Sequence, residues 1–153
     1  MKYIESAKET EEGGCVFCAL VSGDGSGEER VLVRTELAFV TLAKYPYNPG
    51  HLLVLPARHI GEFEDLTVSE NAEIAALMQR AIGALRAESD PAGFNVGVNL
   101  GRVAGAGIPE HLHWHVVPRW GGDTNFMPVI GETRVLPELL ADTFGRLKRR
   151  FEA

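Results

Sequence analysis

The order of hydrophobic and polar positions predicts several short strands, then one long helix, two more strands and a final helix. Runs rich in branched and aromatic residues, separated by turn formers, are typical of strands. Three such runs come early, ERVLVRT (29–35), LAFVTL (37–42) and HLLVLPA (51–57), and two come later, GFNVGVNL (93–100) and HLHWHVVPR (111–119). Because strands and helices do not alternate regularly, we expect an α+β fold with a mainly antiparallel sheet of about five strands and two helices.

The long helix is expected from Thr67 to about Ala87. Thr67 and Glu70 have the spacing of a capping box, in which each side chain satisfies a backbone N–H of the other residue. The apolar positions that follow recur at the spacing of one helix face: Ile74, Leu77, Met78, Ala81, Ile82 and Leu85. Asp90-Pro91 then ends the helix, because proline cannot continue it.

The final helix is expected from roughly Pro137 to Phe151. Its apolar stripe consists of Leu136, Leu139, Leu140, Phe144, Leu147 and Phe151. The basic run RLKRR (146–150) falls in its last turns, where positive charge suits the negative end of the helix dipole. We therefore interpret these charges as a helix terminus and not as a nucleic-acid-binding patch.

Length and composition fit one globular domain, with 153 residues, 45% of them hydrophobic and 24% charged. We assign residues 1–14 to a polar tail and residues 15–153 to the domain. A formal net charge of −6 disfavours a general nucleic-acid-binding protein. The longest apolar run, Cys15 to Val21, is too short to cross a bilayer, and the acidic N-terminus lacks the apolar segment of a secretory leader. We expect no membrane association.

The two cysteines form the pair CVFC (15–18) in CVFCALVSG (15–23), a short apolar turn or helix. Two cysteines cannot build a disulfide framework, which favours a reduced, cytoplasmic protein. The CxxC spacing is that of two tetrahedral zinc ligands. Two other interpretations stay open, a redox pair of the thioredoxin type and two buried cysteines without metal.

Three histidines alternate along the last expected strand: His111, His113 and His115. Alternate strand residues share a face, so the imidazoles gather on one surface. The residues between them form the opposite, buried face: Leu112, Trp114 and Val116. Three interpretations are possible, a solvated polar face, a catalytic zinc site with an open position, and an imidazole nucleophile that attacks phosphorus or carbonyl carbon.

HLHWHVV (111–117) resembles the signature of the histidine-triad family, in which three histidines alternate with apolar residues. PGHLLVLPARHI (49–60) is similar to the second landmark of that family, and WGGDTNFMPVIGETRV (120–135) is similar to the branch that contains bacterial diadenosine-tetraphosphate hydrolases and phosphorylases. The resemblance covers roughly residues 15 to 130. It implies the family fold, a homodimer and an enzyme that cleaves nucleotides at the α-phosphorus.

The resemblance also assigns roles to single residues. It makes His113 the nucleophile, which forms a nucleotidyl-histidine intermediate that water or orthophosphate resolves. It makes His115 a hydrogen-bond donor to phosphate oxygens or the leaving group, and it places His51 and Asn99 beside the substrate. His59 and His111 match the positions that complete the CxxC of Cys15 and Cys18 into a structural zinc site.

Gly105 and Gly107 lie in a glycine-rich loop directly before the triad. Glycine content alone is typical of an ordinary turn, because no Walker-type lysine follows, but the position before the triad favours backbone contacts to phosphate. Ala106-Gly107-Ile108 stands where many relatives carry Gln-Ser or Gln-Thr, so help for the leaving group must come from elsewhere or from the backbone. Ala43 stands where relatives often carry Asp or Asn for the ribose hydroxyls.

Trp120 follows the triad strand in a Gly-Gly loop. A loop tryptophan can stack on a nucleobase, and it can equally pack at a subunit interface.

The favoured activity is hydrolysis of dinucleoside polyphosphates, such as diadenosine tetraphosphate, through His113. Phosphorolysis of the same substrates is the nearest alternative, followed by cleavage of nucleoside phosphoramidates. A zinc-dependent hydrolase or lyase, with the metal on His111 and His113, and a non-enzymatic nucleotide-binding module are the alternatives from other classes.

Overall fold

Five antiparallel strands form one sheet in the computed structural model, which describes residues 14–23, 27–123 and 138–152. The strands are β1 (Val31–Arg34), β2 (Ala38–Leu42), β3 (Leu52–Pro56), β4 (Gly93–Val98) and β5 (Trp114–Arg119). Their order across the sheet is β1-β2-β3-β5-β4, so β1 to β3 form an antiparallel meander and β5 inserts between β3 and β4. The predicted α+β class and five-stranded sheet are confirmed.

The long helix α3 (Val68–Ser89) begins at the predicted capping box. The hydroxyl of Thr67 accepts the backbone N–H of Glu70 over 3.1 Å, and the carboxylate of Glu70 accepts the backbone N–H of Thr67 over 2.8 Å. Asp90 ends the helix with a positive φ of 43°, directly before Pro91.

The last helix, α5 (Leu140–Glu152), is shorter than predicted. It begins at Leu140, and Leu136 and Pro137 lie outside the described residues. Leu139 precedes the helix and is 73% exposed, so its predicted place on the buried stripe is wrong. Leu147 and Phe151 carry the buried face instead.

A third helix, α2 (Val16–Ser22), forms in the segment that contains the cysteine pair. Short 3-10 turns are η2 (Glu28–Arg30), η3 (Phe63–Asp65) and η4 (Arg102–Ala104). Within the described part of the chain, no helix has both the length and the apolar character that a membrane crossing requires. Residues 1–13 of the predicted tail and residues 124–135 of the tail motif lie outside the described residues.

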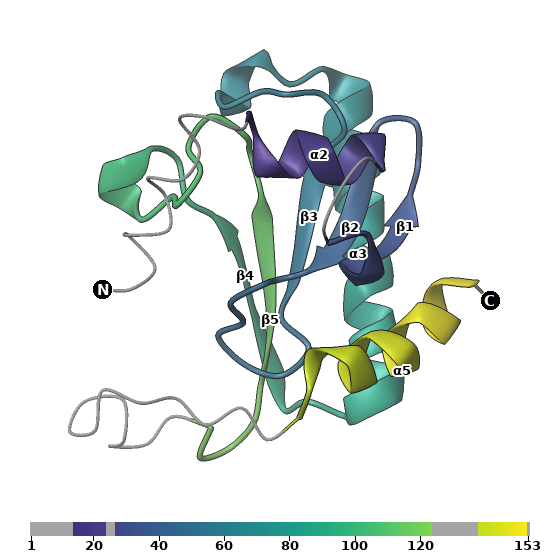
Figure 1. Ribbon diagram of the computed structural model, residues 1–153. Helices are drawn as coiled ribbons and strands as arrows, with labels where there is room; N and C mark the ends of the chain where they lie inside the picture. Colours follow the sequence, from purple (N-terminus) through teal and green to yellow (C-terminus); the bar gives the residue numbers. More distant parts are fainter. Residues whose placement is uncertain (1–13, 24–26, 124–137, 153) are drawn as a thin grey trace.

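The two faces of the sheet are covered by different helices. Figure 1 shows α2 in front of the sheet and α3 behind it, with α5 packed beside α3. The core under α3 and α5 includes Val40, Leu42, Val54, Val116, Ile74, Leu85, Leu147 and Phe151. A smaller cluster under α2 includes Phe17, Leu20, Phe39, Leu53 and Leu55. Because strand side chains alternate, the neighbours Leu53 and Val54 belong to different clusters.

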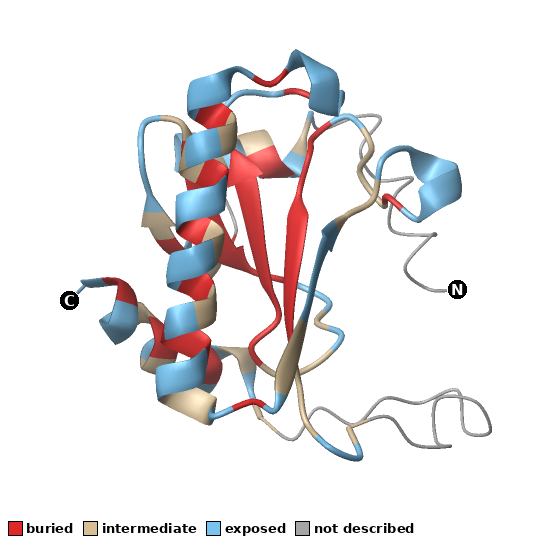
Figure 2. Ribbon diagram, turned by 180° about the vertical axis from the view of Figure 1, so that it is seen from behind, coloured by how far each residue is buried: buried red, intermediate tan, exposed pale blue. Residues whose placement is uncertain are grey.

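β4 is an edge strand, and among the described residues it pairs with β5 alone. Figure 2 shows β4 partly exposed and partly intermediate, whereas its neighbour β5 and the next strand, β3, are buried along almost their whole length. Val96 in β4 is 46% exposed. The sheet therefore presents an unpaired edge next to the histidine-bearing strand.

Candidate active site and metal centre

The three alternating histidines lie at the start of β5. His111 and His113 precede its first residue, Trp114, so the predicted strand over 111–119 is too long at its N-terminal end. His115 lies opposite Leu53 of β3 on one side and Gly97 of β4 on the other. The residues between the histidines belong to the core under α3, as predicted: Leu112, Trp114 and Val116. All three imidazoles are buried, which excludes a solvated polar face.

His113 has one tautomer that fits its surroundings. Its Nδ1 lies 2.8 Å from the main-chain oxygen of His111, and because a carbonyl oxygen only accepts hydrogen bonds, Nδ1 carries the proton. Nε2 therefore keeps its lone pair. Burial lowers the pKa of His113, so the ring is neutral near neutral pH. A neutral imidazole with a lone pair on Nε2 is the form that acts as a nucleophile.

A chain of hydrogen bonds sets the tautomer of His115. The backbone N–H of Tyr47 donates to Nδ1 of His51 over 3.0 Å, so His51 carries its proton on Nε2. This Nε2–H donates to Nδ1 of His115 over 2.9 Å, which leaves Nε2 of His115 as a donor. Burial, with a smaller contribution from His113, lowers the pKa of His115 to about 4. His115 is therefore a neutral hydrogen-bond donor near neutral pH.

A cavity of about 460 Å³ opens beside His115, within the range of roughly 300–1,000 Å³ that is usual for small-molecule sites. Its wall is formed by Tyr47, Asn48, Asn95, Val96, Gly97, Val98, Asn99, His115, Val117 and Arg119. The predicted residues His115 and Asn99 lie in this wall. His113 does not line the cavity itself, but its ring centroid lies 5.2 Å from that of His115.

The glycine-rich loop closes against Asn99. Gly105 has a positive φ of 99°, and a Cβ at this position would lie 3.5 Å from Nδ2 of Asn99. The backbone N–H groups of Gly105 and Ala106 donate to carbonyl oxygens within the loop, over 3.0 and 3.2 Å. These two N–H groups therefore stabilise the loop itself. Of the two glycines predicted to contact phosphate, Gly105 uses its N–H within the loop, whereas Gly107 makes no such bond to any residue that the structure describes.

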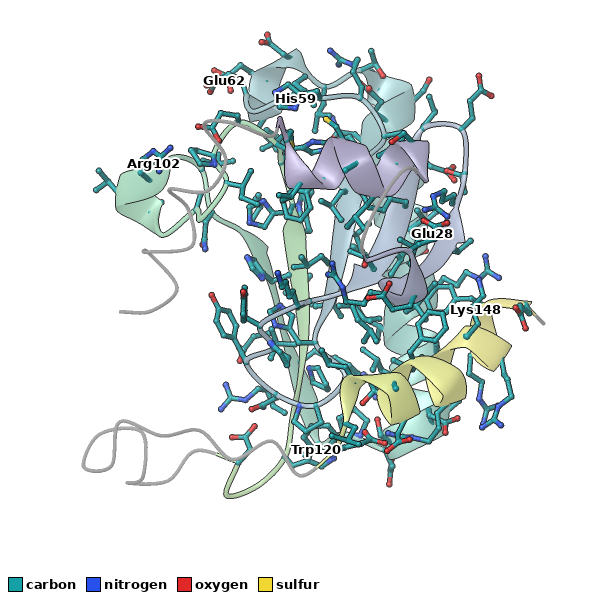
Figure 3. All side chains as sticks on the ribbon, viewed as in Figure 1. Glu28, His59, Glu62, Arg102, Trp120 and Lys148 are labelled. Atoms are coloured by element: carbon teal, nitrogen blue, oxygen red, sulfur yellow. The ribbon has the colours of Figure 1, made fainter. Side chains whose placement is uncertain are left out.

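Trp120 does not lie in the wall of the histidine cavity. Its indole Nε1–H donates to the main-chain oxygen of Ser89 at the end of α3, over 3.3 Å. It contributes to a separate small cavity together with Leu85 of α3 and Leu147 of α5. Figure 3 places Trp120 at the end of the molecule where α5 lies, away from His59 and α2.

Three polar residues of the cavity wall, Asn48, Asn95 and Arg119, were not among the predicted site residues, and Asp123 outside the wall connects to two of them. The carboxylate of Asp123 accepts two hydrogen bonds from Arg119, over 2.6 and 2.8 Å, and one from Asn48 over 2.8 Å. Arg119 also donates to Oδ1 of Asn95 over 2.6 Å. This cluster joins the loop that carries Tyr47 to the ends of β4 and β5. Arg119 lies at an alternate position with His115 on β5, but at the end of a strand this spacing alone is equally typical of a surface residue.

A second cluster lies at the other end of the histidine run. Cys15, Cys18, His59 and His111 each offer one ligand atom, and these atoms lie within 4.8 Å of one another. Sγ of Cys15 and Sγ of Cys18 lie 3.5 and 3.7 Å from Nδ1 of His111, and Sγ of Cys18 lies 3.2 Å from Nδ1 of His59. Tetrahedral zinc holds sulfur and nitrogen ligands about 3.6 Å apart. The four residues thus fit the predicted metal site.

The surroundings of this cluster also fit a metal. Nε2 of His111 lies 2.9 Å from the main-chain oxygen of Pro56, so the proton is on Nε2 and the lone pair of Nδ1 faces the cysteines. The loop that carries His59 is held close, because the N–H of Leu112 donates to the oxygen of Ile60 over 2.7 Å. Burial and the neighbouring Cys15 raise the pKa of Cys18 to about 11, so a metal must displace thiol protons when it binds.

Comparison with known proteins gives consistent matches. A family model for the HIT domain matches residues 25–122. Over 116 residues the chain is 54% identical to a Mycobacterium tuberculosis protein named AP-4-A phosphorylase, a match that covers 76% of this chain and 60% of that protein. The chain thus spans about 60% of the length of these curated relatives.

Solved structures show the same architecture. A Zn-bound histidine triad family protein from Mycobacterium smegmatis superimposes with a TM-score of 0.74 and 29% identity, covering 91% of this chain and 94% of that chain. A HIT family protein from Bacillus anthracis gives a TM-score of 0.66 and 29% identity, covering 72% and 76% of the two chains.

Proposed function

This chain belongs to the HIT domain family, and on that premise we propose that it transfers a nucleoside monophosphate from a dinucleoside polyphosphate, such as diadenosine tetraphosphate, through His113. The observation that carries this proposal is the bond from Nδ1–H of His113 to the oxygen of His111, which leaves the lone pair of a neutral imidazole on Nε2. The cavity beside His115 supports this proposal, because it offers room for a nucleotide close to the ring of His113.

The reaction proceeds in two displacements. Nε2 of His113 attacks the α-phosphorus, a P–N bond forms, and the P–O bond to the remaining phosphates breaks, which releases a nucleoside triphosphate from a tetraphosphate substrate. The acceptor then attacks the same phosphorus and the P–N bond breaks. The bond from Nδ1–H to His111 persists throughout and stabilises the positive charge that the ring carries in the intermediate.

His115 stabilises the charge that develops on phosphate oxygens. The bonds from Tyr47 and His51 keep its Nε2 a donor. Because its pKa of about 4 keeps the ring uncharged, His115 acts by hydrogen bonding and does not deliver a proton from an imidazolium. This donor takes the place of the hydroxyl that many relatives carry before the triad.

We place Asn99 and the backbone of Gly107 next to the phosphates, with Gly105 shaping the loop that holds them. The position of Asn99 in the cavity wall supports its role. Trp120 is left out of this proposed site, because its indole packs between α3 and α5. The substrate contacts are thus concentrated at β4, β5 and the loop between them.

The acceptor that we propose is orthophosphate. The relative that is 54% identical to the chain is named a phosphorylase, which favours phosphate over the water expected from sequence. Attack by orthophosphate on an adenylylated His113 gives ADP, whereas attack by water gives AMP. Diadenosine tetraphosphate would therefore yield ADP and ATP with phosphate present, and AMP and ATP if hydrolysis is the reaction.

We propose that Cys15, Cys18, His59 and His111 hold a structural zinc ion. Bound zinc would supply a tetrahedral anchor with no open position, because four protein ligands fill it. His113 is outside this ligand set and bonds to a carbonyl oxygen, which disfavours the alternative of a zinc-dependent hydrolase or lyase. The thiols that this site needs favour the reducing conditions of the cytoplasm.

We further propose that the chain forms a homodimer through the edge of β4. Val96 on β4 is exposed, and so are Leu100 and Val103 in the loop that follows this strand. An unpaired edge with apolar side chains favours pairing with a second strand. Pairing there would place two cavities near each other, because β4 contributes to the wall of each.

The central experiment is intact-mass analysis after a brief pulse of diadenosine tetraphosphate without orthophosphate. The wild-type chain should gain the mass of one adenylyl group, and His113→Ala should gain none. An adduct that persists in His113→Ala, or turnover that this variant retains, would refute the proposal. Phosphate added to the isolated adduct should release ADP, and release of AMP alone would identify water as the acceptor.

A further inference from the structure

Phe17 contacts both His111, a member of the Cys2His2 cluster (Cys15, Cys18, His59 and His111), and the proposed nucleophile His113. It lies in α2 between the two cysteines, and its side chain is buried, at 8% exposure. Its ring centroid is 5.5 Å from that of His111, with the edge of one ring toward the other, and 5.2 Å from that of His113, with the planes tilted by 48°. Phe17 is therefore in contact with two imidazoles that carry different proposed roles.

The position of Phe17 depends on how α2 is held. α2 has 7 residues, and its N-cap Cys15 makes no capping hydrogen bond through its side chain. A helix this short is not stable alone in water, where about 12–15 residues are needed. Its anchors are Phe17 and Leu20, which pack against the sheet, and the two cysteines of the metal cluster. A metal bound by both cysteines would therefore fix the segment of α2 that carries Phe17.

A second connection runs through the main chain. The ring of His111 is held on one side by the cysteines and on the other by the oxygen of Pro56. The main-chain oxygen of the same residue accepts the Nδ1–H bond of His113. The Cys2His2 cluster is thus connected to His113 in two ways, by the hydrogen bond to the main-chain oxygen of His111 and by the ring contact of Phe17.

We propose that the Cys2His2 cluster orients the nucleophile, and that Phe17 is the positioning residue that transmits this constraint to the ring of His113. This inference rests on the proposed function of His113. The contact of Phe17 limits rotation of the imidazole, and the bond to His111 selects its tautomer. Correct orientation before reaction lowers the barrier, and a displacement of about 1 Å can cost roughly 100-fold in rate.

The test compares Phe17→Leu with Leu20→Ala in the zinc-loaded chain. Leu20 lies one turn further along α2 and is also buried in the same cluster, but it has no aromatic ring that could stack on His111 or His113 as Phe17 does. Four quantities are measured for each variant: zinc per chain, the tautomer of His113 by ¹⁵N NMR of the imidazoles at one fixed pH, the single-turnover rate of adenylyl-adduct formation, and the KM for diadenosine tetraphosphate.

Phe17→Leu should keep its zinc and its substrate affinity, populate a second state of the His113 ring, and form the adduct about tenfold more slowly. Leu20→Ala should lower thermal stability, but the two zinc-bound cysteines would still hold the first turn of α2 with Phe17, so one His113 state and a nearly wild-type rate are expected. An unchanged His113 spectrum in Phe17→Leu would overturn the proposal, and so would a change confined to the KM, which would make Phe17 a substrate contact. If the wild-type chain forms no adduct, the proposed function fails, while the NMR comparison still reports whether Phe17 orients the ring.

Discussion

Nε2 of His51 lies 2.9 Å from Nδ1 of His115, and this bond decides which nitrogen of His115 remains available to a ligand. The direction of the bond follows from Tyr47, whose backbone N–H can only donate to His51. The backbone N–H of Tyr47 thus determines, through His51, that His115 presents Nε2–H to a ligand.

Replacing His51 with alanine should lower the kcat for dinucleotide cleavage by about 10- to 100-fold, because Nδ1 of His115 loses its donor and the ring can present either nitrogen. The KM should change less. Tyr47→Phe is the matched control, since it keeps both the stacked ring and the backbone N–H. Steady-state kinetics of the two variants check this prediction, and equal losses in both would contradict it.

Acid should destabilise the fold through His115. An unfolded histidine binds its proton near pH 6.5, whereas the pKa of buried His115 is about 4. Between these values the unfolded chain binds more protons, so the stability from His115 is complete above pH 6.5 and falls as the pH drops toward 4. The groups around this ring are His51, His113 and Tyr47.

This prediction is checked by urea unfolding at several pH values in wild type and His115→Phe. The free energy of unfolding of the variant should depend less steeply on pH across this window. A slope equal to that of wild type would show that other groups account for the acid sensitivity.

Glu70 should stabilise the start of α3. Its side chain is 5% exposed, and hydrogen bonds from Arg58, followed by those from Thr67, lower its pKa to about 2. The stabilisation is present above the usual carboxyl pKa and is lost only as the pH falls toward 2. Glu70→Gln should cost about 1–2 kcal/mol at neutral pH, measured by chemical denaturation. Glu73→Gln, one turn nearer the middle of α3, is the control and should change stability by much less.

Removing the proposed metal should loosen α2 and leave the main sheet folded. Purified chain should contain about one zinc ion, and Cys18→Ser should bind much less, because one of four ligands is lost. Metal analysis and amide hydrogen exchange measure both effects, with faster exchange expected at residues 15–22. A chain purified under reducing conditions without any metal, and with α2 equally protected, would contradict the prediction.

The proposed dimer contact at the edge of β4 can be tested by measuring the oligomeric state of the chain. Val96→Lys places a charge on this edge and should shift the chain from a dimer toward a monomer of 16.7 kDa, measured by light scattering after size-exclusion chromatography. Val68→Lys, at an exposed position at the start of α3, is the control and should leave the mass unchanged. A wild-type chain that is monomeric at all concentrations would refute the proposed dimer.

Local patterns in the sequence predict much of this architecture. The alternation of His111, His113 and His115 with apolar residues correctly separates the two faces, because alternation is a local property of the chain that continues into β5, although His111 and His113 precede the strand. The capping box at Thr67 and Glu70 is confirmed for the same reason, since its spacing is set within one helical turn.

Contacts between distant segments could not be derived from such patterns. Tyr47 lies in a loop of turn-forming residues, and its bond to His51 depends on how that loop folds back. Arg119 looks like a surface residue at a strand end until Asp123 and Asn95 are brought beside it. Trp120 turns toward α3 because the oxygen of Ser89 is there to accept its N–H, which no local spacing reveals.

Gly97 lies opposite His115 on β4, and at this position the size of the cavity can change independently of the stability of the fold. An added Cβ there would meet no atom within 4 Å, so a larger residue intrudes on the cavity without straining the fold. A substitution of Gly97 by a larger residue should therefore restrict which substrates fit the cavity while the stability of the fold is retained.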